Sequence, residues 1–217
     1  MKIACFQIEP WQEPALREGL VGHEVIIFQD PLTLQNINKA KEAEILTVRV
    51  RGQNLHLKRE IFSQFPNLKF IMTRSTGFDH IDIEKCKEKK ILVSNLPSYG
   101  EESVAEHTFA LLLSISRKIP YIINRKNNHH MQNIQGFDLF GKTLGVIGSG
   151  KIGLRVISLA KAFGMNVVAY DILENKEASI RLNFKYLSLE ELLKVSDVIT
   201  LHAPLTPQTR NIVNEKN

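Results

Sequence analysis

The stretch "TLGVIGSGKIGLRVISLAKAF" (residues 143–163) decides the fold of the second half of this chain. Its first five residues, T-L-G-V-I, include Leu144, Val146 and Ile147, which predicts a buried strand. The next six read G-S-G-K-I-G, and the apolar spacing after them predicts a helix. A strand, a G-x-G-x-x-G turn and a helix in this order are typical of a dinucleotide-binding unit.

Each glycine of the turn has its own steric reason. Gly148 allows the tight turn, Gly150 lets the backbone approach a pyrophosphate, and Gly153 lets the helix pack closely on the strand. The N-terminus of the following helix carries about half a positive charge, which would face the phosphates. The turn therefore predicts a site for a dinucleotide.

An acidic residue at the end of the next strand supports this prediction. The run "NVVAYD" (166–171) reads as a strand that ends in Asp171, about 20 positions after the turn, where a carboxylate binds ribose hydroxyls. A carboxylate repels a 2′-phosphate, and the following Ile172 and Leu173 offer no arginine to receive one. The pattern favours NAD over NADP; the alternative is an ordinary turn residue at a strand end.

A second phosphate-binding pattern overlaps the first. Residues 136–143, "GFDLFGKT", read G-x-x-x-x-G-K-T, as in a P-loop of nucleotide triphosphatases. A P-loop must follow a strand and open a helix, yet polar residues precede this one and the strand at 143 follows it. We therefore interpret the segment as a turn at Gly141 that leads into the strand.

The first half of the chain alternates between short apolar runs and charged stretches with helical spacing. This alternation indicates βαβ units and a parallel sheet. The expected strands are 2–6, 24–28, 44–48, 69–73 and 91–94, and the helical stretches are 14–20, 34–44, 56–65 and 82–90.

We predict an α/β protein of two domains. A flavodoxin-like substrate domain is expected over residues 1–98, and an incomplete Rossmann dinucleotide-binding domain over 99–217. The run 100–119 reads as a long helix that connects them and ends before Pro120, and residues 127–136 read as a loop or frayed helix. A helix at 188–195 and a strand at 197–204 complete the pattern, so one of the two βαβαβ halves is present.

Composition excludes several classes of protein. Lys and Arg are scattered in a chain of net charge +5, which argues against nucleic-acid binding. No apolar run reaches the ~18 residues that a membrane span needs. The two cysteines, Cys5 and Cys86, are too few for a disulfide framework or a zinc site, so we expect no metal and a cytoplasmic location.

Several segments together resemble the D-2-hydroxyacid dehydrogenase family, and within it the D-lactate dehydrogenase-like members. The residues that carry the resemblance are "TRSTGFDHIDIEKCKEKKILVSNLPSYGEESVAEHTFALLL" (73–113), "GKTLGVIGSGKIG" (141–153), "AYD" (169–171) and "LHAPLTPQTRNIVN" (201–214). The resemblance implies an NAD-dependent oxidoreductase that interconverts a small 2-oxo acid and a D-2-hydroxy acid, in a protein that is a homodimer when full length.

The resemblance also implies substrate-binding residues. The backbone N–H groups of Ser75, Thr76 and Gly77 would hold the substrate carboxylate, with a plain turn as the alternative, and His80 would shape this loop. Tyr99 matches a position that lines the substrate, although it could equally pack at the hinge. Val104 matches an apolar wall beside the nicotinamide, with the helix core as the alternative.

The remaining site residues are cofactor-binding by resemblance. Lys151 and Ile152 would contact the pyrophosphate through their backbone, and Ala203, Pro204 and Thr209 would line the ribose and nicotinamide. We expect neither His107 nor His202 to be the acid–base residue.

The catalytic residues of the family, an Arg, a Glu and a His, are expected beyond residue 217. The chain is therefore expected to be an N-terminal fragment without dehydrogenase turnover of its own. A related dehydrogenase acting on phosphoglycerate, glyoxylate or formate is one alternative. The main alternative is a non-catalytic regulatory protein of the same fold that senses NAD(H), since fold does not determine function.

Overall fold

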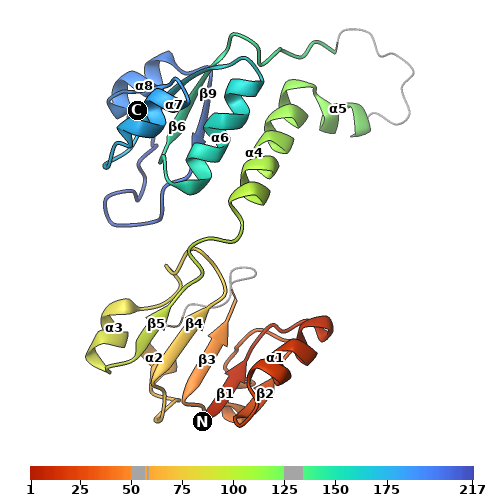
Figure 1. Cartoon of the computed structure of the whole chain (residues 1–217), viewed down its shortest axis with the longest axis vertical. Coiled ribbons are helices and arrows are strands. Elements are labelled where there is room, and N and C mark those ends of the chain that lie inside the picture. The colour runs from red at the N-terminus through yellow and green to blue at the C-terminus, as the bar shows by residue number, and fades with distance from the viewer. Residues whose placement is uncertain (50–56, 58, 125–133) are drawn as a thin grey trace. The chain divides into compact units, whose positions relative to one another are not determined.

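The computed structural model describes residues 1–49, 57, 59–124 and 134–217. The chain divides into two compact units, Met1–Tyr99 and Gly100–Asn217 (Figure 1). Each unit holds a parallel β-sheet flanked by helices, which confirms the expected α/β fold class.

The described part of the first unit contains a five-stranded sheet in the order β2-β1-β3-β4-β5. All neighbouring strands are parallel. The strands are β1 (Lys2–Cys5), β2 (Glu24–Ile27), β3 (Ile45–Val48), β4 (Phe70–Thr73) and β5 (Leu92–Ser94). Since the strands are parallel, the segments that follow β1, β3, β4 and β5 all leave from one edge of the sheet.

Alternate residues of these strands enter two different apolar layers. Ala4 and Leu46 pack into a large core with Phe62 and Cys86, which come from α2 (Arg59–Phe62) and α3 (Ile83–Glu88). Ile3 packs on the opposite face with residues of α1 (Glu13–Gly19), next to the short 3₁₀ turn η1 (Pro10–Gln12). Covering both faces is what a nearly continuous apolar strand requires.

One expected helix of this unit is wrong. Within 34–44 the structure has only the 3₁₀ turn η2 (Ile37–Lys39). The side chain of Asn36 bonds to the carbonyl of Pro31 and accepts from the N–H of Thr33. These local bonds offer the backbone a turn in place of a helix.

The second unit contains, in its described residues, a four-stranded parallel sheet in the order β8-β7-β6-β9. The strands are β6 (Thr143–Ile147), β7 (Asn166–Tyr170), β8 (Lys185–Tyr186) and β9 (Val198–Leu201). The short edge strand β8 was not expected from the sequence. It pairs with the end of β7 through Ala169 and Tyr186.

The helices of this unit are α4 (Glu101–Ser116), α5 (Ile119–Asn124), α6 (Lys151–Ala162), α7 (Lys176–Arg181) and α8 (Leu189–Val195). The expected helix over 100–119 is α4, which ends earlier than expected, at Ser116, and the short helix α5 follows it. Lys118 has φ +57°, a left-handed conformation that ends α4, and Pro120 lies in the first turn of α5, where its missing N–H costs nothing. Most of the predicted loop at 127–136 lies outside the described residues.

The core of the second unit lies where α4 and α6 meet the sheet (Figure 1). Phe109 of α4 stacks on Phe163 at the end of α6, with ring centroids 5.0 Å apart. On the β6 strand, Gly145 faces Leu192 of α8, where a Cβ atom would lie 2.7 Å from the Leu192 side chain. Within the described residues, no helix is long and apolar enough to cross a membrane.

Candidate functional site

The glycine turn after β6 is closely packed at two of its three glycines. Gly148 has φ +92°, and a Cβ atom there would lie 2.7 Å from the backbone N of Ala203. A Cβ atom on Gly153 would lie 2.0 Å from the carbonyl oxygen of Gly148. Both positions therefore require glycine, one for its backbone conformation and both for the close approach of another backbone.

Gly150 differs, because open space surrounds it. No atom lies within 4 Å of the place where its Cβ would be. It is the N-cap of α6 and brings no side chain to cap the helix, and the first turn of α6 has no acidic residue. The N–H groups of Lys151 and Ile152 at this helix start are consequently left for an anion, so the turn fits a diphosphate.

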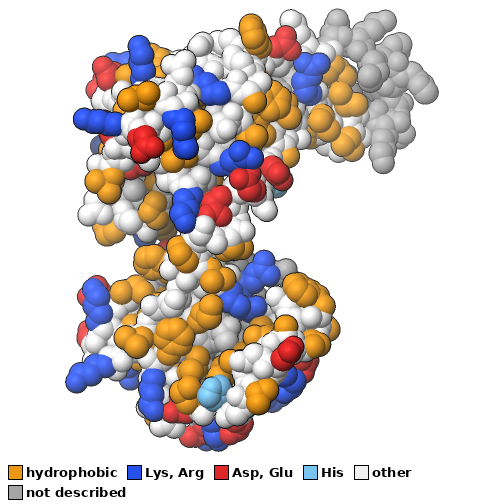
Figure 2. Space-filling model, viewed as in Figure 1, with side chains coloured by type: hydrophobic (Ala, Val, Ile, Leu, Met, Phe, Trp, Pro, Cys, Tyr) orange, Lys and Arg blue, Asp and Glu red, His pale blue; other side chains and the backbone are white. Residues whose placement is uncertain are grey.

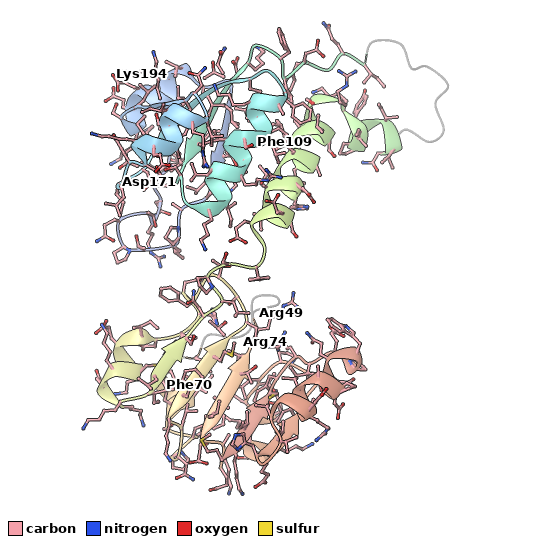
Figure 3. All side chains as sticks on the ribbon, viewed as in Figure 1. Arg49, Phe70, Arg74, Phe109, Asp171 and Lys194 are labelled. Atoms are coloured by element: carbon pink, nitrogen blue, oxygen red, sulfur yellow. The ribbon has the colours of Figure 1, made fainter. Side chains whose placement is uncertain are left out.

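Asp171 directly follows β7 (Figure 3), and its carboxylate is bound to Ser149 of this turn. Its Oδ2 accepts hydrogen bonds from the N–H of Ser149 at 2.6 Å and from the Ser149 hydroxyl at 3.0 Å. Its Oδ1 accepts from the N–H of Leu173 at 3.1 Å. Burial opposes the charge on Asp171, but these hydrogen bonds outweigh it and hold the pKa of the carboxyl below its ordinary value. Asp171 is therefore a fixed anion beside the glycine turn.

The segment after β9 packs on the same turn, through the contact of Ala203 with Gly148 described above. Thr209 fixes the loop that follows, since its hydroxyl donates to the carbonyl of Pro204 and accepts from the N–H of Thr206. His202 contacts Thr200 through Nε2 at 2.8 Å, and burial lowers its pKa. The fold thus brings Gly148, Asp171 and Ala203 to the carboxyl edge of one sheet, where ligands bind in open α/β proteins.

In the first unit, the loop Ser75–Gly77 follows β4 at the carboxyl edge of the sheet. All three of its carbonyl groups accept hydrogen bonds. The N–H of Leu96 donates to Ser75, the side-chain amide of Asn95 donates to Thr76 at 2.8 Å, and the Ser75 hydroxyl donates to Gly77 at 2.7 Å. The three carbonyl oxygens thereby have protein donors, although Thr76 and Gly77 are exposed.

The N–H groups of the same loop are in the opposite situation. Across the part of the chain that the structure describes, no acceptor faces the N–H of Ser75, Thr76 or Gly77. Arg74 lies next to them, and its guanidinium donates to the carbonyls of Phe6 and Gln7, the latter at 3.0 Å (Figure 3). The arginine therefore adds positive charge behind the loop, while the loop amides remain the groups that can hold a carboxylate.

Other predicted residues lie on the surface of their own units. Tyr99, the last residue of the first unit, is 59% exposed. Val104 is 42% exposed on α4, so it is not a helix-core residue, and His107 is exposed on the same helix. Gly141, the turn glycine of the rejected P-loop pattern, has φ +75° and leads directly into β6 without a helix.

Sequence reasoning missed several residues that support these two sites. Ser149 is only a variable position of the G-x-G-x-x-G pattern, and the sequence gives no signal for Tyr186, Thr73 or Asn95. No pattern in the sequence marks Tyr186 or Asn95, because their partners lie far away along the chain: Tyr186 is 37 residues from Ser149, and Asn95 is 19 residues from Thr76.

Comparison with known proteins shows which family has a glycine turn and an acidic residue in this arrangement. Residues 109–217 match the family model of the NAD-binding domain of D-isomer specific 2-hydroxyacid dehydrogenases. The chain belongs to this family. The cofactor of this domain is NAD, as the glycine turn and Asp171 predicted. The expected family resemblance is thereby confirmed.

The names of individual relatives refer to different substrates. The chain is 42% identical over 224 residues to an aromatic 2-oxoacid reductase of Clostridium sporogenes, covering 100% of this chain and 66% of that protein. It is 39% identical over 211 residues to a D-3-phosphoglycerate dehydrogenase of Methanocaldococcus jannaschii, covering 96% of this chain and 40% of that protein.

Among solved structures, D-lactate dehydrogenase from Aquifex aeolicus, complexed with NAD and lactic acid, superimposes with a TM-score of 0.86 at 38% identity. The alignment covers 99% of this chain and 64% of that one. The chain thus spans 40% to 66% of the length of these three relatives.

Proposed function

We propose that the chain is the substrate-binding and cofactor-binding part of an NAD-dependent oxidoreductase that interconverts a 2-oxo acid and a D-2-hydroxy acid. One observation carries the proposal: the glycine turn is open at Gly150, leads into the uncapped start of α6 and binds the fixed anion Asp171 through Ser149. This arrangement offers donors for a diphosphate and acceptors for a ribose diol.

NAD, when bound, accepts a hydride from the hydroxy acid or, in reduced form, supplies one to the 2-oxo acid. The chain's own residues bind and orient. We assign the diphosphate to the N–H groups of Lys151 and Ile152, the ribose to Asp171, and the cofactor walls to Val104, Ala203, Pro204 and Thr209. The substrate carboxylate is assigned to the N–H groups of Ser75, Thr76 and Gly77, and Tyr99 is assigned to the substrate side.

We assign no acid–base residue to this chain. His202 uses its Nε2 atom in the contact with Thr200, and burial disfavours its charged form. His107 is exposed on α4, where we find no described group that would orient its ring for proton transfer. We therefore propose that the 217 residues alone have no dehydrogenase turnover.

The substrate is proposed as a class. The relatives named above carry the names of an aromatic 2-oxoacid reductase, a phosphoglycerate dehydrogenase and a D-lactate dehydrogenase, which share a carboxylate next to the reacting carbon. The Ser75–Gly77 loop would bind that shared carboxylate. It does not determine which side chain the substrate carries. A D-lactate-like acid is the specific member that we propose.

We also propose a homodimer in the cytoplasm. Apolar side chains gather on the outer face of α4 and on α5, where Leu111, Ile115 and Ile123 are 53%, 61% and 55% exposed (Figure 2). A contiguous exposed apolar surface of this kind is typical of an interaction site. Cys5 and Cys86 are free and buried, as in proteins of a reducing compartment.

Ligand binding tests the proposal directly. We expect NADH fluorescence to change on adding the 217-residue chain, and NADH to raise its melting temperature in proportion to the logarithm of concentration. ATP is the control for the P-loop alternative, and it should leave the melting temperature unchanged. Stabilisation by ATP but not by NADH would overturn the proposal, and turnover of pyruvate by the chain alone would contradict the assignment of acid–base residues.

A further inference from the structure

A chain of hydrogen bonds reaches the Asp171 carboxylate from the far edge of the sheet. The N–H of Asn175 donates to the Tyr186 hydroxyl at 3.0 Å. The Tyr186 hydroxyl lies 2.8 Å from the hydroxyl of Ser149, and Ser149 donates to Asp171 Oδ2 at 3.0 Å. The four residues come from separate segments of the second unit, namely the glycine turn, the end of β7, the N-cap of α7 and β8.

The direction of every bond in this chain can be assigned by counting hydrogens. An ionised carboxylate only accepts, so the single hydroxyl hydrogen of Ser149 points to Asp171. The Ser149 oxygen is then an acceptor toward Tyr186, and the phenol must donate to it. The N–H of Asn175 can only donate, which leaves the Tyr186 oxygen as its acceptor. All donors therefore point toward the carboxylate, and each hydroxyl polarises the next.

The structure also holds Tyr186 in place. Its backbone pairs with Ala169, two residues before Asp171, and its ring packs edge-on against Phe184 with centroids 5.1 Å apart. Ser149 is 5% exposed, so its hydroxyl does not have water as an easy alternative partner. The tyrosine is thus a rigid support for the serine, and the serine for the carboxylate.

We propose that Tyr186, acting through Ser149, is a positioning residue that holds Asp171 toward the cofactor ribose and so sets the preference for NAD over NADP. The inference rests on the proposed role of Asp171 at the ribose. A carboxylate that cannot rotate away repels a 2′-phosphate at that place, and the exposed neighbours Ile172 and Leu173 supply no cation to receive one. If the support is removed, the carboxylate gains freedom to turn aside.

The test compares Tyr186→Phe with Tyr170→Phe in the 217-residue chain. Tyr170 is a matched control, because its hydroxyl has no hydrogen-bond partner among the described residues and it lies next to Asp171. Dissociation constants for NADH and NADPH are measured by fluorescence titration. Loss of one hydrogen bond of about 0.5–1.5 kcal/mol predicts a roughly 2- to 12-fold weaker binding of NADH in Tyr186→Phe, with NADPH weakened less or strengthened.

Two further variants separate positioning from general destabilisation. Ser149→Ala should reproduce the change in the NADH-to-NADPH ratio, and the double variant should add nothing to it, since both act on one carboxylate. A purely structural role would lower the melting temperature of Tyr186→Phe while leaving the ratio as in the wild type. That result would overturn the inference.

A measurement of the Asp171 pKa without cofactor tests the positioning role of Tyr186 separately from the proposed function. The carboxyl ¹³C resonance of Asp171 reports its pKa, which should rise in Tyr186→Phe and stay constant in Tyr170→Phe. An unchanged pKa in Tyr186→Phe overturns the positioning role whatever the ligand data show. If the pKa rises but NADH binds neither to the wild type nor to any variant, the proposed function fails, and with it the assignment of Asp171 to the ribose.

Discussion

The Nε2 atom of His80 lies 3.0 Å from the Oγ1 atom of Thr73, and the loop that follows Thr73 determines which of the two atoms donates. The Ser75 hydroxyl gives its hydrogen to the carbonyl of Gly77. Thr73 must then give its own hydrogen to Ser75, 2.6 Å away, and accept one from His80. The Nε2 atom of His80 therefore carries a hydrogen, and a buried histidine is the start of a hydrogen-bond chain that ends in the proposed carboxylate loop.

This assignment predicts that His80→Leu and His80→Gln behave differently. Leucine leaves Thr73 without a donor, whereas the side-chain amide of glutamine can supply one near the position of Nε2. We expect His80→Leu to lower the free energy of unfolding by about 1 kcal/mol more than His80→Gln, and to increase amide hydrogen exchange at Leu96. Urea denaturation and exchange measured by mass spectrometry test this, and equal effects of the two substitutions would contradict the assigned direction.

The glycine turn predicts opposite outcomes for alanine at two of its positions. In Gly153→Ala the new methyl group meets the Gly148 carbonyl at 2.0 Å, and relief of this overlap should cost roughly 1–3 kcal/mol of stability. In Gly150→Ala the methyl group meets no protein atom, so stability should be retained. NADH should nevertheless bind more weakly to Gly150→Ala, because the methyl group occupies the space assigned to the diphosphate.

Melting temperatures and NADH titrations of both variants check this pair. A stable Gly150→Ala with wild-type affinity for NADH would show that the cofactor backbone does not pass over this residue. A Gly153→Ala as stable as the wild type would contradict the close contact between the start of α6 and the glycine turn.

The buried imidazole of His202 predicts a loss of stability as the pH falls. Burial lowers the pKa of His202 below its ordinary value of 6.5, so between the two values the unfolded chain binds more protons than the folded one. The contribution of His202 is therefore fully present above pH 6.5 and is lost as the pH falls toward the folded pKa. A His202→Gln variant should lose less stability than the wild type between pH 7.5 and about 5.5.

Proton NMR provides the direct measurement, since the titration midpoint of the His202 ring should fall below the ordinary value of 6.5. Urea unfolding of the wild type and of His202→Gln at both pH values gives the difference in stability. A midpoint at or above 6.5 would show that burial does not control the pKa of His202.

The apolar face of α4 predicts self-association. Replacing Leu111 and Ile115 by lysine should leave the fold intact, because both side chains are more than half exposed in the chain alone. The same change should abolish a dimer that buries them, because it places charges in an apolar interface. Sedimentation velocity at several concentrations distinguishes the two proteins. Identical sedimentation of wild type and variant would remove α4 from the proposed interface.

Much of the fold could be predicted because it depends on local pattern. The alternation of short apolar runs with helical stretches predicted the strands β1 to β7 and β9, and the G-x-G-x-x-G turn with Asp171 indicated NAD from the sequence alone. The prediction of a helix at 34–44 was wrong, because the spacing of apolar residues carries no information about the side-chain hydrogen bonds of Asn36, which favour a turn. The end of the helix expected over 100–119 lies three residues beyond the end of α4, because Lys118 is an unusual residue for the left-handed conformation that ends this helix.

The sequence by itself determined which chemistry the chain can bind, since a glycine turn, a helix start and an acidic residue are each encoded over a few neighbouring residues. Only the tertiary structure decided what holds these groups. Tyr186 reaches Ser149 across 37 residues and Asn95 reaches Thr76 across 19, and parallel strands bring such distant segments to one edge of a sheet. Hydrogen bonds of this kind depend on distances in space, and a single sequence carries no record of those distances.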